Sequence, residues 1–89
     1  MNEITILIPF YNEERNIVRQ LKDIIDNISK LKNYKFKLLL VDDGSIDEGA
    51  KKVENFFLNN PKIEYNLIKH QKNLGKTQTF ATAFKVVES

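Results

Sequence analysis

The run Leu38-Leu39-Leu40-Val41-Asp42-Asp43-Gly44-Ser45 decides the fold of this chain. Its first four residues are apolar, without the polar alternation of a strand that has one face in water. Such a pattern is typical of a strand buried on both faces, as in a parallel sheet. Two carboxylates, a glycine and a serine follow at once. We therefore predict a buried strand over residues 36–41 with polar groups at its carboxyl end.

Similar patterns flank this strand. A short, mostly β-branched run over residues 4–8 indicates a first strand, and a weaker run over residues 63–68 indicates a third one near an edge. Apolar stripes at helical spacing follow the three strands. They are formed by Ile17, Leu21, Ile24, Ile25, Ile28 and Leu31, by Ala50, Val53 and Phe57, and by Phe80, Ala83, Phe84 and Val87. The alternation predicts a three-layer, Rossmann-like α/β fold (βαβαβα), with a parallel sheet in the order 3-2-1 and helices on both faces.

Two helix starts carry capping signals. We expect Asn12 to cap the first helix, with Glu13 and Glu14 in its first turn, where acidic side chains suit the helix dipole. Ser45 and Glu48 have the spacing of a capping box, which predicts that the second helix begins beside them.

Composition restricts the class of protein. The chain has 89 residues, which make one small domain over residues 1–89. Its net charge is only +2 and its basic residues are scattered, so nothing indicates nucleic-acid binding. The absence of cysteine excludes disulfides, a thiol nucleophile and a thiolate metal site. No apolar run approaches the roughly 18 residues of a membrane span, and we expect a cytoplasmic location.

Polar residues gather in three segments, 9–13, 42–47 and 70–76, each directly after a predicted strand. The carboxyl ends of parallel strands are where such sheets bind ligands. The Tyr11 ring offers a flat face to a nucleobase. Gly75 and Lys76 precede a helix, where phosphate is the natural ligand. In the alternative interpretation, Tyr11 packs on the sheet edge and Lys76 belongs to a solvated turn.

The adjacent acids Asp42 and Asp43 indicate two different roles. Successive residues of a strand point in opposite directions, so the two carboxylates cannot share one function. One accepts backbone N–H groups and holds its loop, while the other faces the crevice and accepts from a base N–H or a ribose hydroxyl. The alternative interpretation is a solvated turn with a helix cap at Ser45.

Gly75-Lys76-Thr77 matches the end of a P-loop. The full pattern requires a glycine five positions before Gly75, and that position is His70. The segment also follows the third strand rather than the first, so we exclude a P-loop ATPase. We predict that His70 is a loop residue rather than a base or a metal ligand.

The order of the motifs resembles the opening of family 2 glycosyltransferases. The matching segments are Ile8–Glu14, Leu40–Asp47 and Asn73–Lys76. The resemblance implies an inverting enzyme with the A-type glycosyltransferase fold, of which this chain is the N-terminal nucleotide-binding portion. The sequence departs from the family at Thr77, where a glycine is frequent, and at Phe80 and Phe84, where small residues are usual.

The resemblance also implies site residues. Pro9, Tyr11 and Glu13 would line a nucleoside pocket, and Val41 and Asp43 would contact the base. Asp42 would brace the loop, while Gly75 and Lys76 would lie near the ribose or the diphosphate. The implied donor is a UDP- or GDP-sugar. The implied acceptor is a saccharide or a polyprenyl phosphate, which would place the complete protein at the membrane surface.

In the family, a fourth strand carries an Asp-x-Asp motif that holds Mg²⁺ or Mn²⁺. This chain ends at Ser89, before that strand. The resemblance therefore implies a truncated domain without a catalytic residue or metal ligand of its own, inactive alone, with an open sheet edge that favours self-association. An alternative hypothesis is a non-catalytic α/β module that binds a nucleotide or a partner. A signalling receiver is excluded, because its acidic pair should follow the first strand.

Overall fold

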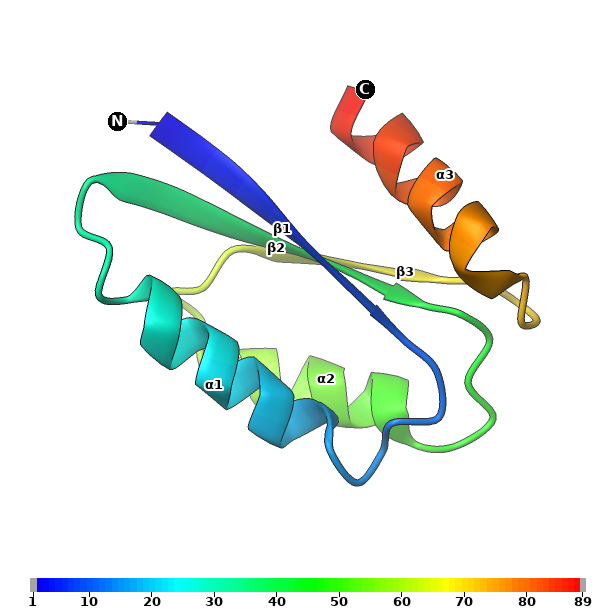
Figure 1. Cartoon of the computed structure of the whole chain (residues 1–89). Helices are drawn as coiled ribbons and strands as arrows, with labels where there is room; N and C mark the ends of the chain where they lie inside the picture. The colour runs from blue at the N-terminus through cyan, green and yellow to red at the C-terminus, as the bar shows by residue number, and fades with distance from the viewer. Residues whose placement is uncertain (1, 89) are drawn as a thin grey trace.

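The computed structural model describes residues 2–88, and of residues 84 and 86–88 it describes the backbone alone. Strands and helices alternate along these residues as predicted (Figure 1). The elements are β1 (Asn2–Phe10), α1 (Ile17–Ile28), β2 (Tyr34–Asp42), α2 (Gly49–Leu58), β3 (Tyr65–Lys69) and α3 (Gly75–Glu88).

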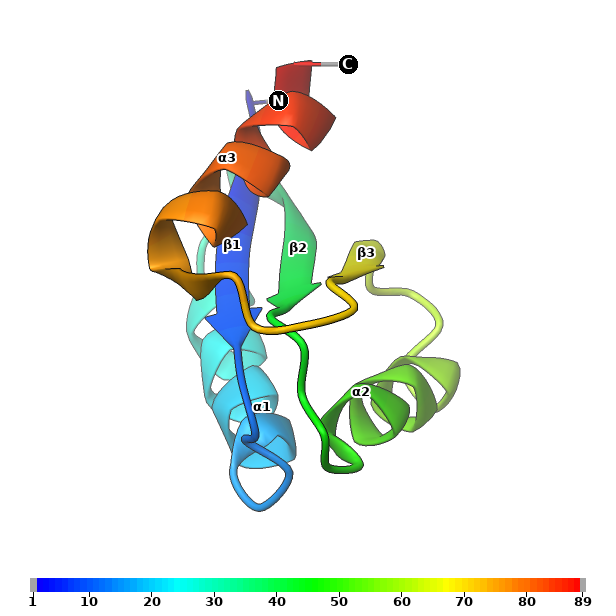
Figure 2. The same cartoon turned by 90° about the vertical axis from the view of Figure 1, so that its right-hand side faces the viewer.

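The described residues form one three-stranded sheet in the order β1-β2-β3, with both pairs parallel. In the middle of the sheet, Leu40 lies opposite Ile8 of β1 and Leu67 of β3. The helices α1 and α2 cover one face and α3 covers the other (Figures 1 and 2). The predicted strand order and layers are confirmed, and β3 is an edge strand, as its weak pattern indicated.

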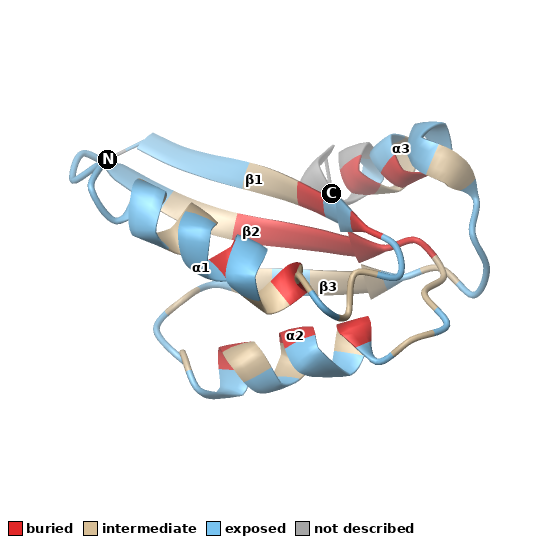
Figure 3. Ribbon diagram, turned by 60° about the horizontal axis from the view of Figure 1, so that its bottom comes forward, coloured by how far each residue is buried: buried red, intermediate tan, exposed pale blue. Residues whose placement is uncertain are grey.

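The apolar run of β2 is buried on both faces of the sheet, as its lack of polar alternation predicted. Leu38 and Leu40 are fully buried in the core beneath α1 and α2. Leu39 and Val41 point the other way and pack with Ala83 of α3. Figure 3 shows the buried residues concentrated along the second half of β2. Each such side chain contributes about 1.5–3 kcal/mol on leaving water, so this strand anchors both layers.

The first helix begins later than predicted. It starts at Ile17, no acidic residue lies in its first turn, and Asn12 is not its cap. Asn12 adopts a left-handed backbone conformation with φ of 52°, and its side-chain Oδ1 accepts a hydrogen bond from the Ile46 N–H. Glu13 and Glu14 consequently lie in a loop before the helix. The capping prediction was wrong because a contact 34 residues away uses the capping atom.

The predicted capping box of the second helix is also wrong. The helix begins at Gly49, after Ser45 and Glu48. The Ser45 hydroxyl accepts a hydrogen bond from the Asn12 N–H at 2.9 Å instead of serving the helix. Asp47 Oδ1 accepts from the Gly49 N–H at 2.9 Å and satisfies the start of the helix.

The predicted apolar stripes hold for α1 as far as Ile28 and for Val53 and Phe57 of α2, and they fail in part for α3. Leu31 lies beyond the end of α1 and is 50% exposed. Phe80, predicted on the inner face of α3, is 44% exposed, whereas Thr79 and Ala83 are buried against the sheet. Residues four apart share one face of a helix, so Thr79 and Ala83 lie together and Phe80 turns away. The predicted inner positions Phe84 and Val87 have side chains outside the described part of the structure.

Candidate functional site

The segments that follow the three strands lie side by side at the carboxyl edge of the sheet. The Asp43 N–H donates to the Phe10 carbonyl, and the His70 N–H donates to the Asp42 carbonyl, both at 2.9 Å. These bonds extend the pairing of the strands by one residue on each side of β2. The three segments singled out in the sequence are therefore brought together.

The loops after β1 and β2 are joined by reciprocal hydrogen bonds. Asn12 donates its N–H to the Ser45 hydroxyl at 2.9 Å and accepts the Ile46 N–H at 3.0 Å. The Glu14 N–H donates to Asp47 Oδ2 at 3.1 Å. Asparagine tolerates the left-handed conformation found at position 12, and these bonds hold it there.

Asp42 and Asp43 are both buried, at 4% and 6% exposure, and both accept backbone N–H groups. Asp42 Oδ1 accepts from the Ser45 N–H at 2.8 Å, which is the bracing contact expected of it. Asp43 accepts from the Leu74 N–H at Oδ1 and from the Gly75 N–H at Oδ2, at 2.9 and 3.0 Å. We expected one acid to brace its loop and the other to be free for a ligand. Asp43 is not entirely free, because it also braces the loop after β3.

Asp43 also pairs with His70. The His70 Nδ1 lies 2.9 Å from Asp43 Oδ1, and the two side chains are 8% and 9% exposed. Burial raises the pKa of the Asp43 carboxyl, but hydrogen bonds from His70, Leu74 and Gly75 outweigh it and lower the pKa below 3.8. The carboxylate is therefore ionised at neutral pH and can only accept hydrogen bonds.

Gly44 permits the close approach of the loops after β2 and β3. Its φ is +79°, and a Cβ placed there would lie 2.3 Å from the Lys72 carbonyl carbon and 2.4 Å from the Asn73 nitrogen. Real side chains do not tolerate such distances to backbone atoms. A glycine at this position is thus required for the loop that donates to Asp43 to cross over the β2 turn.

A cleft of about 270 Å³ opens among these loops. It is lined by Pro9, Phe10, Tyr11, Glu13, Gln20, Asp43, Lys76 and Thr79. Five of the eight residues predicted to bind nucleotide are among them. The Tyr11 residue is 43% exposed, so its ring is accessible from the cleft.

Three of the predicted residues do not line this cleft. Val41 is fully buried and packs on Leu39, so its side chain is not available to a base. Asp42 bonds to its own turn, and Gly75 contributes its N–H to Asp43. Gln20, Phe10 and Thr79 were not anticipated. Helical spacing from Gly75 could have indicated Thr79, whose hydroxyl donates to the Gly75 carbonyl at 3.1 Å, but no sequence signal pointed to Gln20.

A larger hollow of about 750 Å³ lies along the outer side of β3. Its lining comes from α2 and β3, namely Glu54, Leu58, Tyr65, Asn66, Leu67 and Lys69. None of the converging loop residues reaches it. We assign the functional site to the smaller cleft, because convergent polar groups rather than volume distinguish a binding site.

The described residues do not supply a metal centre. Residues 2–88 contain no group of three or more His, Cys, Asp or Glu side chains that could hold an ion. Asp42 and Asp43 are turned toward N–H donors, so this part of the chain does not fit a divalent cation. In the same residues, no helix has the length and apolar character needed to cross a bilayer.

The family model and the relatives of named activity that this chain matches are all glycosyltransferases. Residues 5–89 match the model of Glycosyl transferase family 2. An uncharacterized protein from Methanocaldococcus jannaschii is 38% identical over 79 residues, which are 89% of this chain and 31% of that protein. A dolichyl-phosphate beta-glucosyltransferase from Dictyostelium discoideum is 32% identical over 77 residues, covering 82% of this chain and 24% of that enzyme.

An undecaprenyl-phosphate 4-deoxy-4-formamido-L-arabinose transferase from Proteus mirabilis is 39% identical over 54 residues, covering 61% of this chain and 16% of that enzyme. The chain thus spans 16% to 31% of the length of these relatives. A mannosyltransferase from Pyrobaculum calidifontis, solved in complex with GDP-Man and Mn²⁺, superimposes with a TM-score of 0.80 at 24% identity, covering 92% of this chain and 23% of that one. This likeness confirms the predicted fold.

Proposed function

Because this chain belongs to glycosyl transferase family 2, we propose that its cleft binds the nucleotide of a UDP- or GDP-sugar donor. The complete enzyme would transfer the sugar with inversion to a saccharide or a polyprenyl-phosphate acceptor. The observation that carries the proposal is the convergence of the Tyr11 ring, the ionised Asp43 carboxylate and Lys76 in one cleft.

Base recognition would depend on Asp43. Among the residues that the structure describes, its Oδ2 has one donor, the Gly75 N–H, and a carboxylate oxygen can accept more than one hydrogen bond. An acceptor-only group favours a base that presents a ring N–H. Uracil and guanine do so, whereas cytosine and adenine carry a bare ring nitrogen at the corresponding position. This chemistry supports UDP or GDP as the donor nucleotide.

The other cleft residues suit the rest of the nucleotide. Stacking on an aromatic ring such as Tyr11 is worth about 1–3 kcal/mol per base. Lys76 lies in the first turn of α3, where backbone N–H groups and the helix dipole favour a phosphate. Glu13 offers a carboxylate to the ribose hydroxyls from the wall formed by the loop after β1.

The class of acceptor is supported by the relatives. Two of them are named for transfer to undecaprenyl phosphate and dolichyl phosphate. We therefore propose that the complete enzyme acts at the cytoplasmic surface of a membrane.

NMR titrations of the chain with UDP, GDP, CDP and ADP test the proposal. We expect weak binding of UDP or GDP, with Kd on the order of millimolar, and shifts centred on the residues that line the cleft. Tyr11→Leu should weaken binding without loss of folding, because the ring is exposed. Asp43→Asn should weaken it by about 1.5–3 kcal/mol, the worth of a hydrogen bond to a charged group.

Asp42→Asn serves as the matched control, because Asp42 does not line the cleft. It should lower the free energy of unfolding more than the affinity for nucleotide. Equal shifts with all four nucleotides, or shifts confined to lysines, would indicate charge attraction alone and would contradict the proposal.

A further inference from the structure

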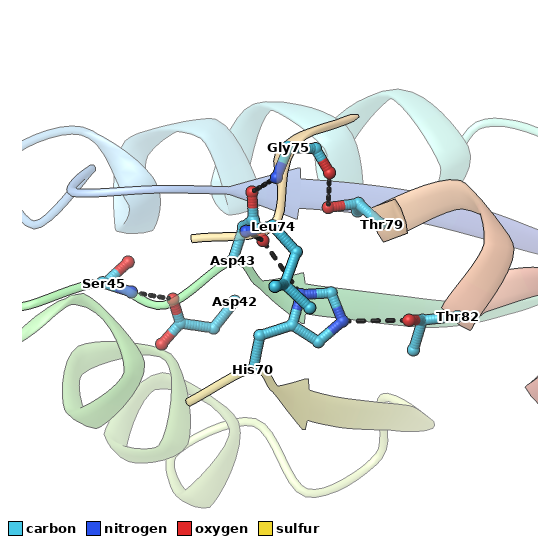
Figure 4. Close-up of polar contacts among 8 residues, drawn as sticks. All are labelled: Asp42, Asp43, Ser45, His70, Leu74, Gly75, Thr79 and Thr82. Carbon is cyan, nitrogen blue, oxygen red and sulfur yellow. Dashed lines mark hydrogen bonds and ion pairs between the residues drawn. The ribbon is translucent and has the colours of Figure 1, made fainter. Parts of the chain in front are cut away.

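The side chain of His70 connects Asp43, which lines the cleft, to Thr82 of α3. Its Nδ1 contacts Asp43 Oδ1 and its Nε2 contacts the Thr82 hydroxyl, both at 2.9 Å (Figure 4). We propose that His70 is a positioning residue: it fixes the Asp43 carboxylate so that Oδ2 is presented to the base, and it ties that carboxylate to α3. The base-binding part of this inference rests on the proposed function.

The direction of the hydrogen bonds follows from the charge on Asp43. An ionised carboxylate accepts and cannot donate, so the proton of this contact belongs to His70 Nδ1. In the neutral ring Nε2 is then the acceptor and the Thr82 hydroxyl is the donor. The contact with Asp43 therefore selects the Nδ1–H tautomer.

The two oxygens of Asp43 are used unequally. Within the described part of the chain, Oδ1 accepts from His70 and from the Leu74 N–H, whereas Oδ2 accepts from the Gly75 N–H alone. The pair of donors at Oδ1 sets the rotation of the carboxylate. Oδ2 is consequently the oxygen with acceptor capacity left for a ligand.

The contact with Thr82 extends this control to α3. Lys76 and Thr79 line the cleft and belong to the same helix as Thr82. A shift of His70 would therefore move the acceptor for the base relative to Lys76, which is proposed to face the phosphates. The sequence offered no sign of this role, because the partners of His70 lie 27 and 12 residues away.

Two variants that each replace one ring nitrogen of His70 with an amide group separate the two contacts. His70→Asn retains an N–H donor near the position of Nδ1 and loses the contact with Thr82. His70→Gln retains a polar group near the position of Nε2 and loses the contact with Asp43. We expect His70→Gln to weaken UDP or GDP binding about tenfold, the usual effect of one lost hydrogen bond to a charged group, and His70→Asn to weaken it much less.

A second measurement does not require nucleotide. The amide signals of Leu74 and Gly75 report the ionisation of Asp43, because both N–H groups donate to it. The His70 hydrogen bond lowers the pKa of Asp43, so His70→Gln should raise the pH at which these signals titrate, and His70→Asn should leave it near the wild-type value. The ¹⁵N shifts of the neutral ring should show the Nδ1–H tautomer.

The outcomes distinguish the two proposals. If the wild type binds neither UDP nor GDP, the proposed function is wrong, and the titration of Leu74 and Gly75 still decides the role of His70. If both variants shift that titration equally, or if the neutral ring is the Nε2–H tautomer, the positioning role is wrong. A selective effect of His70→Gln on titration and affinity would support both.

Discussion

Replacement of Gly44 by alanine should disrupt the crossing of the loops after β2 and β3. The new methyl group would lie 2.3–2.4 Å from backbone atoms of Lys72 and Asn73, and backbone cannot move aside as a flexible side chain can. The left-handed conformation at φ +79° adds about 1–2 kcal/mol of strain for a residue with a Cβ. The substitution therefore has a steric and a conformational cost.

The steric cost can be derived from the contacts that a shifted loop would lose. Movement at Lys72 and Asn73 displaces the N–H groups of Leu74 and Gly75, which donate to the buried Asp43 carboxylate. A hydrogen bond to a charged group is worth about 1.5–3 kcal/mol. Loss of one of them together with the strain gives about 2.5–5 kcal/mol. This is a large part of the roughly 4–13 kcal/mol typical of a domain of this size.

Gly75→Ala is the matched control. Its φ is +86°, nearly the same as that of Gly44, but apart from its chain neighbours and its own helix backbone no described heavy atom lies within 4 Å of the added Cβ. It should cost only the conformational strain, about 1–2 kcal/mol. Urea unfolding followed by far-UV circular dichroism measures both variants. Similar losses for the two, or a larger loss for Gly75→Ala, would refute the steric argument, whereas a Gly44→Ala protein too unstable to fold beside a folded Gly75→Ala would support it.

Three further expectations concern stability and association. The pKa of Asp43 is lower in the folded chain than its ordinary 3.8. Its ionised form therefore stabilises the fold fully above that pH, and this stabilisation disappears as the pH falls through the folded value. Asp43→Asn should remove this part of the acid dependence of the urea midpoint. Leu40→Ala should cost about 2–5 kcal/mol in the fully buried core, while Ile46→Ala at 89% exposure should change stability by less than about 0.5 kcal/mol in the same assay. The edge strands β1 and β3 each pair on one side within residues 2–88, so sedimentation should show association that increases with concentration, and a monomer at all concentrations would contradict this.

The layers and the place of the site were predictable because they follow from local patterns. An apolar run without alternation requires cover on both faces, and Leu38 to Val41 receive it from helices on both sides. The alternation of strands and helices determines that all three polar segments leave the sheet at one edge. Neither inference depends on knowing which residues meet across a loop.

The helix starts were predicted wrongly for the opposite reason. Asn12 and Ser45 have the side chains of capping residues, and in isolation a cap is their best local use. In the folded chain they hydrogen-bond to each other's loops across 33 and 34 residues. The local capping signal is overridden because both side chains bond across the two loops and hold them together, which a helix cap would not do.

The adjacent acids Asp42 and Asp43 differ in how much of their role the sequence predicts. The partner of Asp42 is the Ser45 N–H, three residues away, so a turn motif in the sequence already contains the information needed to predict its bracing role. The partners of Asp43 are His70, Leu74 and Gly75, between 27 and 32 residues away. Two buried carboxylates are tolerated side by side because each is satisfied by donors of its own. The geometry of Asp43 therefore depends on the assembled loops, because its partners are distant in sequence. Its capacity to accept a hydrogen bond from a base is set by the folding of the whole site rather than by its own turn.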